Sequence, residues 1–161
     1  MKLSYIIPVY NGEKSIVRTL DSIYNTGLAE NEFEIIIVDD CSTDNTWGVL
    51  MEMQKAHSNL VILHQETNQR QGAARNRGID IARGEYIAFC DADDEVVSEG
   101  VMNALRAVEN THADICYFDF EYEKQDGQWE QFAMPQATEN AILSAEEYLN
   151  NYYQLKIKQL L

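Results

Sequence analysis

Four acidic residues lie within a span of five, directly after an apolar segment. The stretch EYIAFCDADDE covers residues 85–95; its first half is typical of a strand, and its second half contains Asp91, Asp93, Asp94 and Glu95. If the chain stays extended, residues two apart point the same way, so Asp91 and Asp93 can aim at one point. Two carboxylates about 6 Å apart repel each other by roughly 3 kcal/mol at an effective dielectric constant near 20. A divalent cation would turn this repulsion into binding.

A metal at this position indicates chemistry on a diphosphate. Carboxylates, water and phosphate oxygens suit Mg²⁺ or Mn²⁺. Such an ion, joining Asp91 or Asp93 to two phosphates, would stabilise a departing diphosphate. The simpler alternative is that these acids cap the next helix, which suits Asp94 or Glu95 better than Asp91. A D-x-D triplet alone is weak evidence, because short acidic triplets are common.

Three further polar clusters strengthen the case for a site. They are VYNGE at residues 9–13, VDDCSTDNT at residues 38–46 and ETNQRQGAARN at residues 66–76, and each follows an apolar run. In an open α/β sheet, ligands bind at the carboxyl ends of the strands. Four polar clusters at one edge of a sheet therefore predict a shared binding site.

The side chains in these clusters suit a nucleotide. Tyr10 can stack on a base, or it can belong to the core. Asp39 or Asp40 can accept hydrogen bonds from a pyrimidine N–H or from ribose hydroxyl groups. Arg75 can hold phosphate through its guanidinium fork or pair with Asp91, and both can hold, one in the empty protein and one in the complex. Capping of the following helix is predicted for Ser42, Thr43 or Asp44.

The elements that must position these clusters alternate along the chain. Apolar runs predict strands at residues 2–10, 33–40, 59–65, 85–91 and 113–123. Helical spacing predicts helices at residues 13–25, 41–57, 72–84 and 98–112. This order predicts an α/β fold whose mostly parallel central sheet has helices on both faces. Gly84 is predicted to stop the third helix. Gly127 is predicted to form the turn of a hairpin or exposed loop within residues 123–141. Ser144 and Glu147 are predicted to form a capping box.

The composition limits the class of protein. The chain has 161 residues, enough for one domain with a sizeable core, and no apolar run approaches the length that spans a bilayer. The formal net charge of −15 argues against a nucleic-acid partner, because a phosphate backbone would repel the chain. Three widely spaced cysteines argue against a disulfide framework or a zinc site and favour a reducing compartment. We interpret the histidines, His57, His64 and His112, as structural or surface residues.

The quoted clusters also resemble a known family. The segments IPVYNGE, IIIVDDCSTDNT and NQRQGAARNRGIDIARGEYIAFCDADD are similar to the nucleotide-binding half of family 2 glycosyltransferases with the GT-A fold, a Rossmann-like sandwich. They cover most of the first hundred residues in the family's order and spacing. The resemblance implies transfer of a sugar from a nucleotide sugar, commonly a UDP-sugar, to a saccharide or lipid-linked acceptor with inversion at the anomeric carbon.

The resemblance also implies roles for individual residues. Asp91 and Asp93 match the triplet that holds Mn²⁺ or Mg²⁺, Arg75 matches the arginine of the A-R-N motif, and Asp94 matches a position beside the donor sugar. The implied contacts to the donor nucleotide are Pro8, Tyr10, Asn11, Glu13, Asp39, Asp40, Arg75, Asp91 and Ala92; among these, Tyr10, Asp39 and Asp40 match base and ribose contacts.

The chain departs from the family pattern at two points. Arg70 stands where many relatives have glycine, so the loop is expected to approach the donor differently. An inverting enzyme also needs a general base, and no residue of this chain can be assigned to that role. The candidates, none in the expected context, are Asp119, Glu121, Glu146 and Glu147.

We expect residues 1–125 to form the nucleotide-sugar-binding core. Residues 126–161 would begin an acceptor-side region, and the final LKIKQLL has the pattern of a helix in mid-course, so we expect a fragment of a longer enzyme. The alternative is a catalytically incomplete nucleotide-binding fragment. We expect a cytoplasmic protein that can lie peripherally at the inner face of the membrane, and a homodimer is compatible with the sequence.

Other classes fit the residues less well. A sugar-1-phosphate nucleotidyltransferase would need a Gly-rich, basic loop after the first strand, where YNGEKS offers too little. An aspartyl-phosphate phosphatase or a receiver domain would carry its acids near the first strand. A calcium loop needs glycine at its sixth position, which both acidic clusters lack.

Overall fold

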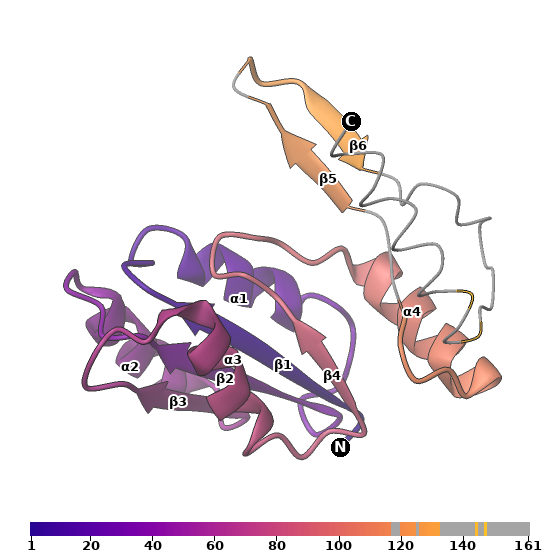
Figure 1. Ribbon diagram of the computed structural model, residues 1–161, viewed down its shortest axis with the longest axis horizontal. Coiled ribbons are helices and arrows are strands. Elements are labelled where there is room, and N and C mark those ends of the chain that lie inside the picture. Colours follow the sequence, from indigo (N-terminus) through magenta and orange to yellow (C-terminus); the bar gives the residue numbers. More distant parts are fainter. Residues whose placement is uncertain (117–119, 125, 133–143, 145–146, 148–161) are drawn as a thin grey trace. The chain divides into compact units, whose positions relative to one another are not determined.

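Four parallel strands form the central sheet of the protein (Figure 1). The computed structural model describes residues 1–116, 120–124, 126–132, 144 and 147. The strands are β1 (Leu3–Val9), β2 (Phe33–Asp39), β3 (Leu60–His64) and β4 (Tyr86–Phe89), and their order across the sheet is β3-β2-β1-β4. Every pair of neighbouring strands in this four-stranded sheet is parallel, as the alternation of strands and helices predicts.

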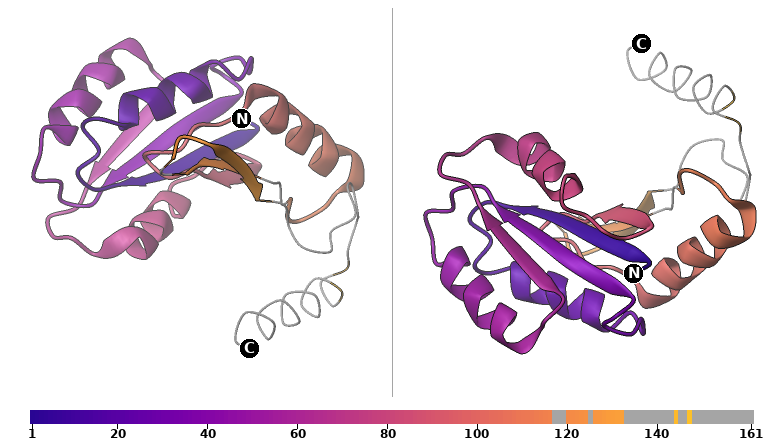
Figure 2. Two further views of the ribbon diagram at one scale, coloured as in Figure 1. Left: turned by 90° about the horizontal axis from the view of Figure 1, so that it is seen from above. Right: turned by 90° about the horizontal axis from the view of Figure 1, so that it is seen from below.

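The two central strands form the core of the sheet. Every residue of β1 and β2 is buried, including the β-branched run Ile35, Ile36 and Ile37. A continuous apolar run is the pattern of a strand that is covered on both faces. Helices α1 (Ile16–Tyr24) and α2 (Thr46–Ala56) cover one face, and α3 (Arg70–Ile79) covers the other (Figure 2). The predicted α/β fold with helices on both faces is therefore confirmed.

Close packing explains the small residues of α3. Ala74 and Gly78 are its buried residues, and the helix packs against β1 and β2. A Cβ atom at Gly78 would lie 2.5 Å from Cγ2 of Ile6, which no side chain tolerates without displacement. The A-R-N-R-G segment therefore places its small residues against the sheet and leaves Arg75 near the carboxyl edge.

The third helix is shorter at its C-terminal end than the sequence predicts. It ends at Ile79 rather than at Gly84, and the next turn is closed by the N–H of Ala82, which donates to the carbonyl of Ile79 (3.2 Å). Gly84 has another role. A Cβ atom there would lie 2.5 Å from the backbone nitrogen of Ser4, so glycine allows the chain to pass close to β1.

Of the fifth predicted strand, residues 113–116 are not in a strand, and residues 117–119 lie outside the described part of the chain. Residues 120–123 make β5 (Phe120–Glu123), which pairs antiparallel with β6 (Trp129–Phe132) in a separate two-stranded sheet. Gly127 has φ +78° in the turn, which confirms the predicted hairpin. Ser144 and Glu147 exchange the hydrogen bonds of a capping box, as predicted; the helix expected after them lies outside the described residues.

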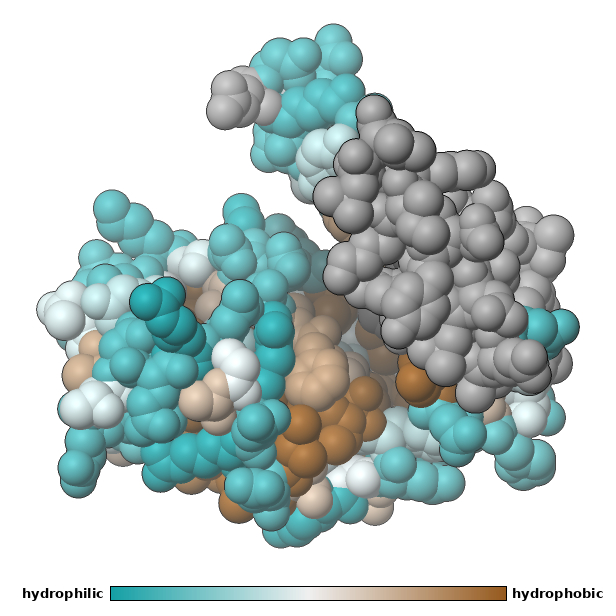
Figure 3. Space-filling view, in the orientation of Figure 1, coloured by the Kyte–Doolittle hydropathy of each residue, from teal (hydrophilic) through white to brown (hydrophobic). Residues whose placement is uncertain are grey.

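The chain divides into two compact units, residues 1–101 and 102–161, and α4 (Ser98–Thr111) spans the boundary. The expected division at residue 125 remains a prediction. In the first unit, β4 is an edge strand that exposes Ile87 and Phe89, and Figure 3 shows brown, hydrophobic surface over it. No helix in the described part of the chain is long and apolar enough to cross a membrane.

Candidate active site

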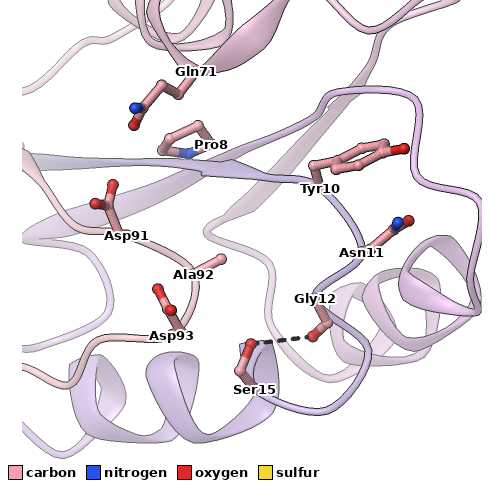
Figure 4. Close-up of a pocket in the computed structure, with 9 residues that line it drawn as sticks. All are labelled: Pro8, Tyr10, Asn11, Gly12, Ser15, Gln71, Asp91, Ala92 and Asp93. Carbon is pink, nitrogen blue, oxygen red and sulfur yellow. Dashed lines mark hydrogen bonds between the residues drawn. The ribbon is translucent and has the colours of Figure 1, made fainter.

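A cavity of about 280 Å³ opens at the carboxyl ends of β1 and β4. The chain runs from β1 outward to β2 and β3, and then returns to place β4 on the other side of β1. At such a switch point the two connections leave in opposite directions, and ligands bind in the crevice between them. Figure 4 shows the lining residues, which are Pro8, Tyr10, Asn11, Gly12, Ser15, Gln71, Asp91, Ala92 and Asp93.

Six of the residues predicted to contact the donor or the metal line this cavity: Pro8, Tyr10, Asn11, Asp91, Ala92 and Asp93. The other five predicted residues lie outside the lining: Glu13, Asp39, Asp40, Arg75 and Asp94. Three lining residues were missed. Gly12 and Ser15 belong to the first polar loop and the start of α1, whereas Gln71 lies in α3, which begins at Arg70, two residues before its predicted start at residue 72.

The loop after β1 is joined to the loop after β2. The backbone N–H of Asn11 donates to Oγ of Ser42 (2.9 Å), and the Asn11 side-chain oxygen accepts from the N–H of Thr43 (2.8 Å). Glu13 accepts a hydrogen bond from the N–H of Asn45 (2.9 Å). The side chains of Asn11 and Glu13 are thus engaged within the protein, and their contacts to a donor remain predictions. Tyr10, half exposed, keeps its ring available to a ligand.

Asp44 supports the start of α2 from the position before its N-cap, which is Asn45 rather than the predicted Ser42, Thr43 or Asp44. Its carboxylate accepts the N–H groups of Thr46 (3.0 Å) and Glu13 (3.2 Å). Burial acts to raise the pKa of Asp44, but the hydrogen bond from the Thr46 hydroxyl group and these backbone hydrogen bonds outweigh it and lower the pKa below its ordinary value. The acid therefore stabilises the joined loops in its ionised form.

The acidic segment after β4 is a turn, not the extended chain expected. The N–H of Asp94 donates to the carbonyl of Asp91 (3.1 Å), so the intervening residues bend. Figure 4 shows Asp91 on the side of the cavity nearer Gln71, whereas the methyl group of Ala92 points toward Tyr10. Asp91 and Asp93 still line one cavity, as predicted. The turn places them there, and not the alternation of side chains along an extended strand.

Arg18 of α1 holds this turn in place. Its Nη2 donates to the backbone carbonyl of Asp93 (3.2 Å), and its Nε pairs with the carboxylate of Glu95 (2.9 Å). The following residues continue along α1, since the N–H of Val96 donates to Oγ of Ser22 (3.0 Å). Glu95 is thus a structural partner of Arg18 and lies outside the cavity lining.

Arg75 and Asp91 form an ion pair with an Nη2–Oδ1 distance of 2.6 Å. The guanidinium carbon lies 6.0 Å from the centre of the Phe89 ring, and the buried Nε of Arg75 has no partner in the described part of the chain. The predicted pairing of Arg75 with Asp91 is confirmed. A phosphate that entered the cavity could accept hydrogen bonds from the same guanidinium.

Electrostatic repulsion is visible in the acidic turn. Burial and then the carboxylates of Asp93 and Asp91 raise the pKa of Asp94 above its ordinary value. Burial, followed by the carboxylates of Asp94, Asp91 and Asp93, raises the pKa of the Cys90 thiol to about 12. The turn therefore has a strongly negative potential, which a cation would relieve.

The two acids at the end of β2 have different partners. The Asp39 side chain is fully buried; its Oδ1 accepts the N–H of Ser42 (3.2 Å) and its Oδ2 contacts Nδ1 of His64 (2.8 Å). In Asp40, Oδ1 alone accepts two hydrogen bonds, from Nε2 of Gln65 (2.6 Å) and from the N–H of Gln69 (2.7 Å). His64, expected to be structural or surface, is the partner of Asp39.

The donor set fits a divalent cation only in part. No group of three or more His, Cys, Asp or Glu side chains suited to a metal exists among the described residues. The Asp93 carboxylate makes no hydrogen bond or ion pair with any described residue, and Asp91 has Oδ1 on Arg75. Two carboxylates suit an ion such as Mg²⁺ or Mn²⁺ that takes its other ligands from water and substrate phosphates.

The candidates for a general base belong to the second compact unit or lie outside the described residues. Glu147 accepts hydrogen bonds from Ser144, and Glu121 lies on β5, in the second compact unit. Asp119 and Glu146 lie outside the described residues. The acidic side chains that line the cavity are those of Asp91 and Asp93.

A parallel sheet with a polar cavity at its switch point defines an α/β protein of the Rossmann-like, ligand-binding class. The chain matches "Glycosyl transferase family 2" over residues 4–159 and therefore belongs to that family. It is 40% identical over 116 residues to the poly(ribitol-phosphate) beta-glucosyltransferase of Bacillus spizizenii, which covers 71% of this chain and 18% of the relative.

Solved structures show the same GT-A fold. The crystal structure of Staphylococcus aureus TarS in complex with UDP has a TM-score of 0.66 and 36% identity, covering 71% of this chain and 34% of that one. The mannosyltransferase PcManGT from Pyrobaculum calidifontis, in complex with GDP-Man and Mn²⁺, has a TM-score of 0.63 and 25% identity, covering 66% and 32%. The chain spans about a fifth of the length of the curated poly(ribitol-phosphate) transferases it matches.

Proposed function

We propose that this chain carries the donor-binding part of an inverting glycosyltransferase that uses a UDP-sugar and a saccharide or lipid-linked acceptor. The observation that carries the proposal is the cavity at the switch point of the sheet, which brings Tyr10 together with Asp91 and Asp93. The UDP complex of TarS, a relative at 36% identity, supports uridine as the nucleoside of the donor.

The residues of the cavity can divide the work of donor binding. The exposed ring of Tyr10 offers a surface on which a base can stack. Arg75 now pairs with Asp91 and can turn part of its guanidinium fork to a phosphate oxygen. Asp91 and Asp93 would hold Mn²⁺ or Mg²⁺. When bound, such an ion neutralises charge on the departing diphosphate.

The turn must keep these groups in place during the reaction. Arg18 ties the turn to α1 through the Asp93 carbonyl and Glu95, so the two acids need little reorganisation when the donor arrives. Inversion, the acceptor and a cytoplasmic location are parts of the proposal that rest on family membership.

Calorimetric titration of UDP, with and without Mn²⁺, tests the proposal. We expect binding in the micromolar range that requires the metal and weakens at least tenfold in Asp93→Asn, because this change removes a ligand charge. Glu99→Gln, which removes one exposed carboxylate from the first turn of α4, should bind UDP like the unaltered protein. Failure of UDP to bind in the presence of Mn²⁺ would refute the donor assignment.

A second candidate function is donor binding without transfer. It is favoured by one observation: among the described residues, the acids in the cavity lining are Asp91 and Asp93. Both are assigned to the metal, so neither remains as a base. Release of free sugar from a UDP-sugar, at a rate that falls in Asp93→Asn, would distinguish an active site from a binding site.

A further inference from the structure

Asp39 and Asp40 are adjacent in the sequence, but only one has an oxygen left for a ligand. Both oxygens of Asp39 are engaged, by Ser42 and His64, and its side chain has no exposed surface. Oδ2 of Asp40 has no partner among the described residues, because both donors, Gln65 and Gln69, meet Oδ1. Asp40, which is 3% exposed, is therefore the acid of this pair with a side-chain oxygen that no described residue engages.

Two hydrogen bonds on one oxygen fix the orientation of a carboxylate. The last side-chain torsion of aspartate is soft, so an unsupported carboxylate rotates easily. In Asp40, rotation would break the hydrogen bonds from Nε2 of Gln65 and from the N–H of Gln69, at 2.6 and 2.7 Å. Gln65 is only 3% exposed, so water could not easily replace the lost bonds.

We propose that Gln65 is a positioning residue that orients Asp40 and thereby selects the nucleobase. The inference rests on the proposed function, since it takes a nucleotide donor as the ligand. The oriented carboxylate presents Oδ2, which is only an acceptor. Uracil offers an N–H at its ring nitrogen N3, whereas N3 of cytosine is an acceptor. An acceptor facing an acceptor is unfavourable, so the geometry selects uridine over cytidine.

Replacement of Asp40 by asparagine tests the orientation directly. Gln65 and Gln69 both donate, so they will hold the amide oxygen of the new side chain and turn its NH₂ group toward the ligand. The group facing the base then changes from acceptor to donor and suits N3 of cytosine. We expect the ratio of UDP to CDP affinity in the presence of Mn²⁺ to fall at least tenfold in Asp40→Asn, which corresponds to one hydrogen bond gained or lost.

Gln65→Ala tests the positioning role itself. We expect UDP affinity to fall about tenfold and the preference for UDP over CDP to narrow. In the double variant Gln65→Ala, Asp40→Asn, the ratio of UDP to CDP affinity should change less than in Asp40→Asn alone. The N–H of Gln69 is then the one remaining donor of the pair that orients the amide. Gln54→Ala is the matched control: this glutamine also makes one side-chain hydrogen bond, to the carbonyl of Leu60, and its loss should leave the preference unchanged.

The outcomes separate the inference from the proposed function. If the unaltered protein binds neither UDP nor CDP with Mn²⁺, both fail together. If it binds UDP and Asp40→Asn keeps the same ratio of affinities, the donor site stands and the role of Gln65 is refuted. A loss of UDP affinity in Gln65→Ala without any change of base preference would also refute it, because a structural defect weakens both nucleotides alike.

Discussion

Glu34 is a buried carboxylate at the opposite end of the sheet from the cavity, and its partner Arg83 offers a quantitative test of the fold. Oε1 of Glu34 accepts hydrogen bonds from Oγ of Ser4 (2.7 Å) and from the N–H of Arg83 (2.7 Å). Oε2 accepts two from the Arg83 side chain, from Nε (3.0 Å) and Nη2 (2.6 Å). The Glu34 side chain is 1% exposed, whereas that of Arg83 is 66% exposed.

Arg83→Ala removes both hydrogen bonds to Oε2 and leaves a buried charge half satisfied. Hydrogen bonds to charged groups contribute about 1.5–3 kcal/mol each, and breaking a fully buried ion pair costs about 3–5 kcal/mol. Because the arginine is mostly exposed, water can enter when it is removed, and solvent already screens the pair. We therefore expect the free energy of unfolding to fall by about 2 kcal/mol at pH 7.

The loss should depend on pH. Burial acts to raise the pKa of Glu34, but the hydrogen bonds from Arg83 and Ser4 outweigh it and lower the pKa below its ordinary value. A lowered folded-state pKa contributes stability above the unfolded pKa, near 4.3 for glutamate, and that contribution is lost as pH falls through the folded-state pKa. Arg83→Ala should therefore cost less at acidic pH than at pH 7.

Urea denaturation at pH 7 and at a pH below about 4 measures both effects. Arg106→Ala, which removes an exposed arginine of α4, is the control and should change the free energy of unfolding little at either pH. A loss in Arg83→Ala of equal size at both pH values would refute the electrostatic explanation. No loss at pH 7 would refute the claim that the pair stabilises the fold.

Three further predictions concern the loops around the cavity. Gly12→Ala should lower the free energy of unfolding by about 1–3 kcal/mol in thermal denaturation, because the new Cβ would lie 2.6 Å from Cγ2 of the buried Val9; unchanged stability would show that the loop yields freely. Arg70 has φ +69°, so Arg70→Gly should be neutral or stabilising whereas Arg70→Val should cost about 1–2 kcal/mol; equal effects of the two variants would exclude backbone strain at this position. Cys90, buried and with its pKa raised to about 12, should react with iodoacetamide at pH 8 more slowly than the partly exposed Cys41, as followed by peptide mass spectrometry, and faster labelling of Cys90 would contradict the assigned burial.

Local patterns in the sequence were sufficient for the order of elements. The continuous apolar runs at residues 33–40 and 59–65 predict covered strands, and the glycine at residue 127 predicts the hairpin turn that the structure confirms. The polar clusters after each strand predict a site at one sheet edge, because parallel strands bring their carboxyl ends together. Six of the predicted site residues do line one cavity, so this part of the site follows from residue order alone.

Arg70 shows how a sequence departure can be explained only by structure. The family resemblance implies glycine at this position, where this chain has arginine, but it gives no reason for the glycine. The backbone at this position is left-handed, with φ +69°, a conformation that glycine adopts at no steric cost. Helix α3 begins at Arg70, two residues earlier than predicted, and Gln71 in its first turn lines the cavity.

The sequence by itself determined the alternation of strands and helices, the parallel sheet and the set of polar loops at its carboxyl edge, since these depend on periodicity and on neighbours along the chain. Only the tertiary structure decided which acid of Asp39 and Asp40 keeps a free oxygen, because their partners His64 and Gln65 come from another strand and its following loop. It likewise decided that the acidic segment after β4 bends into a turn, whereas the pairing of Arg75 with Asp91 was among the sequence predictions. Hydrogen bonds between residues 16 to 25 positions apart depend on strand order and register, which local sequence patterns do not specify.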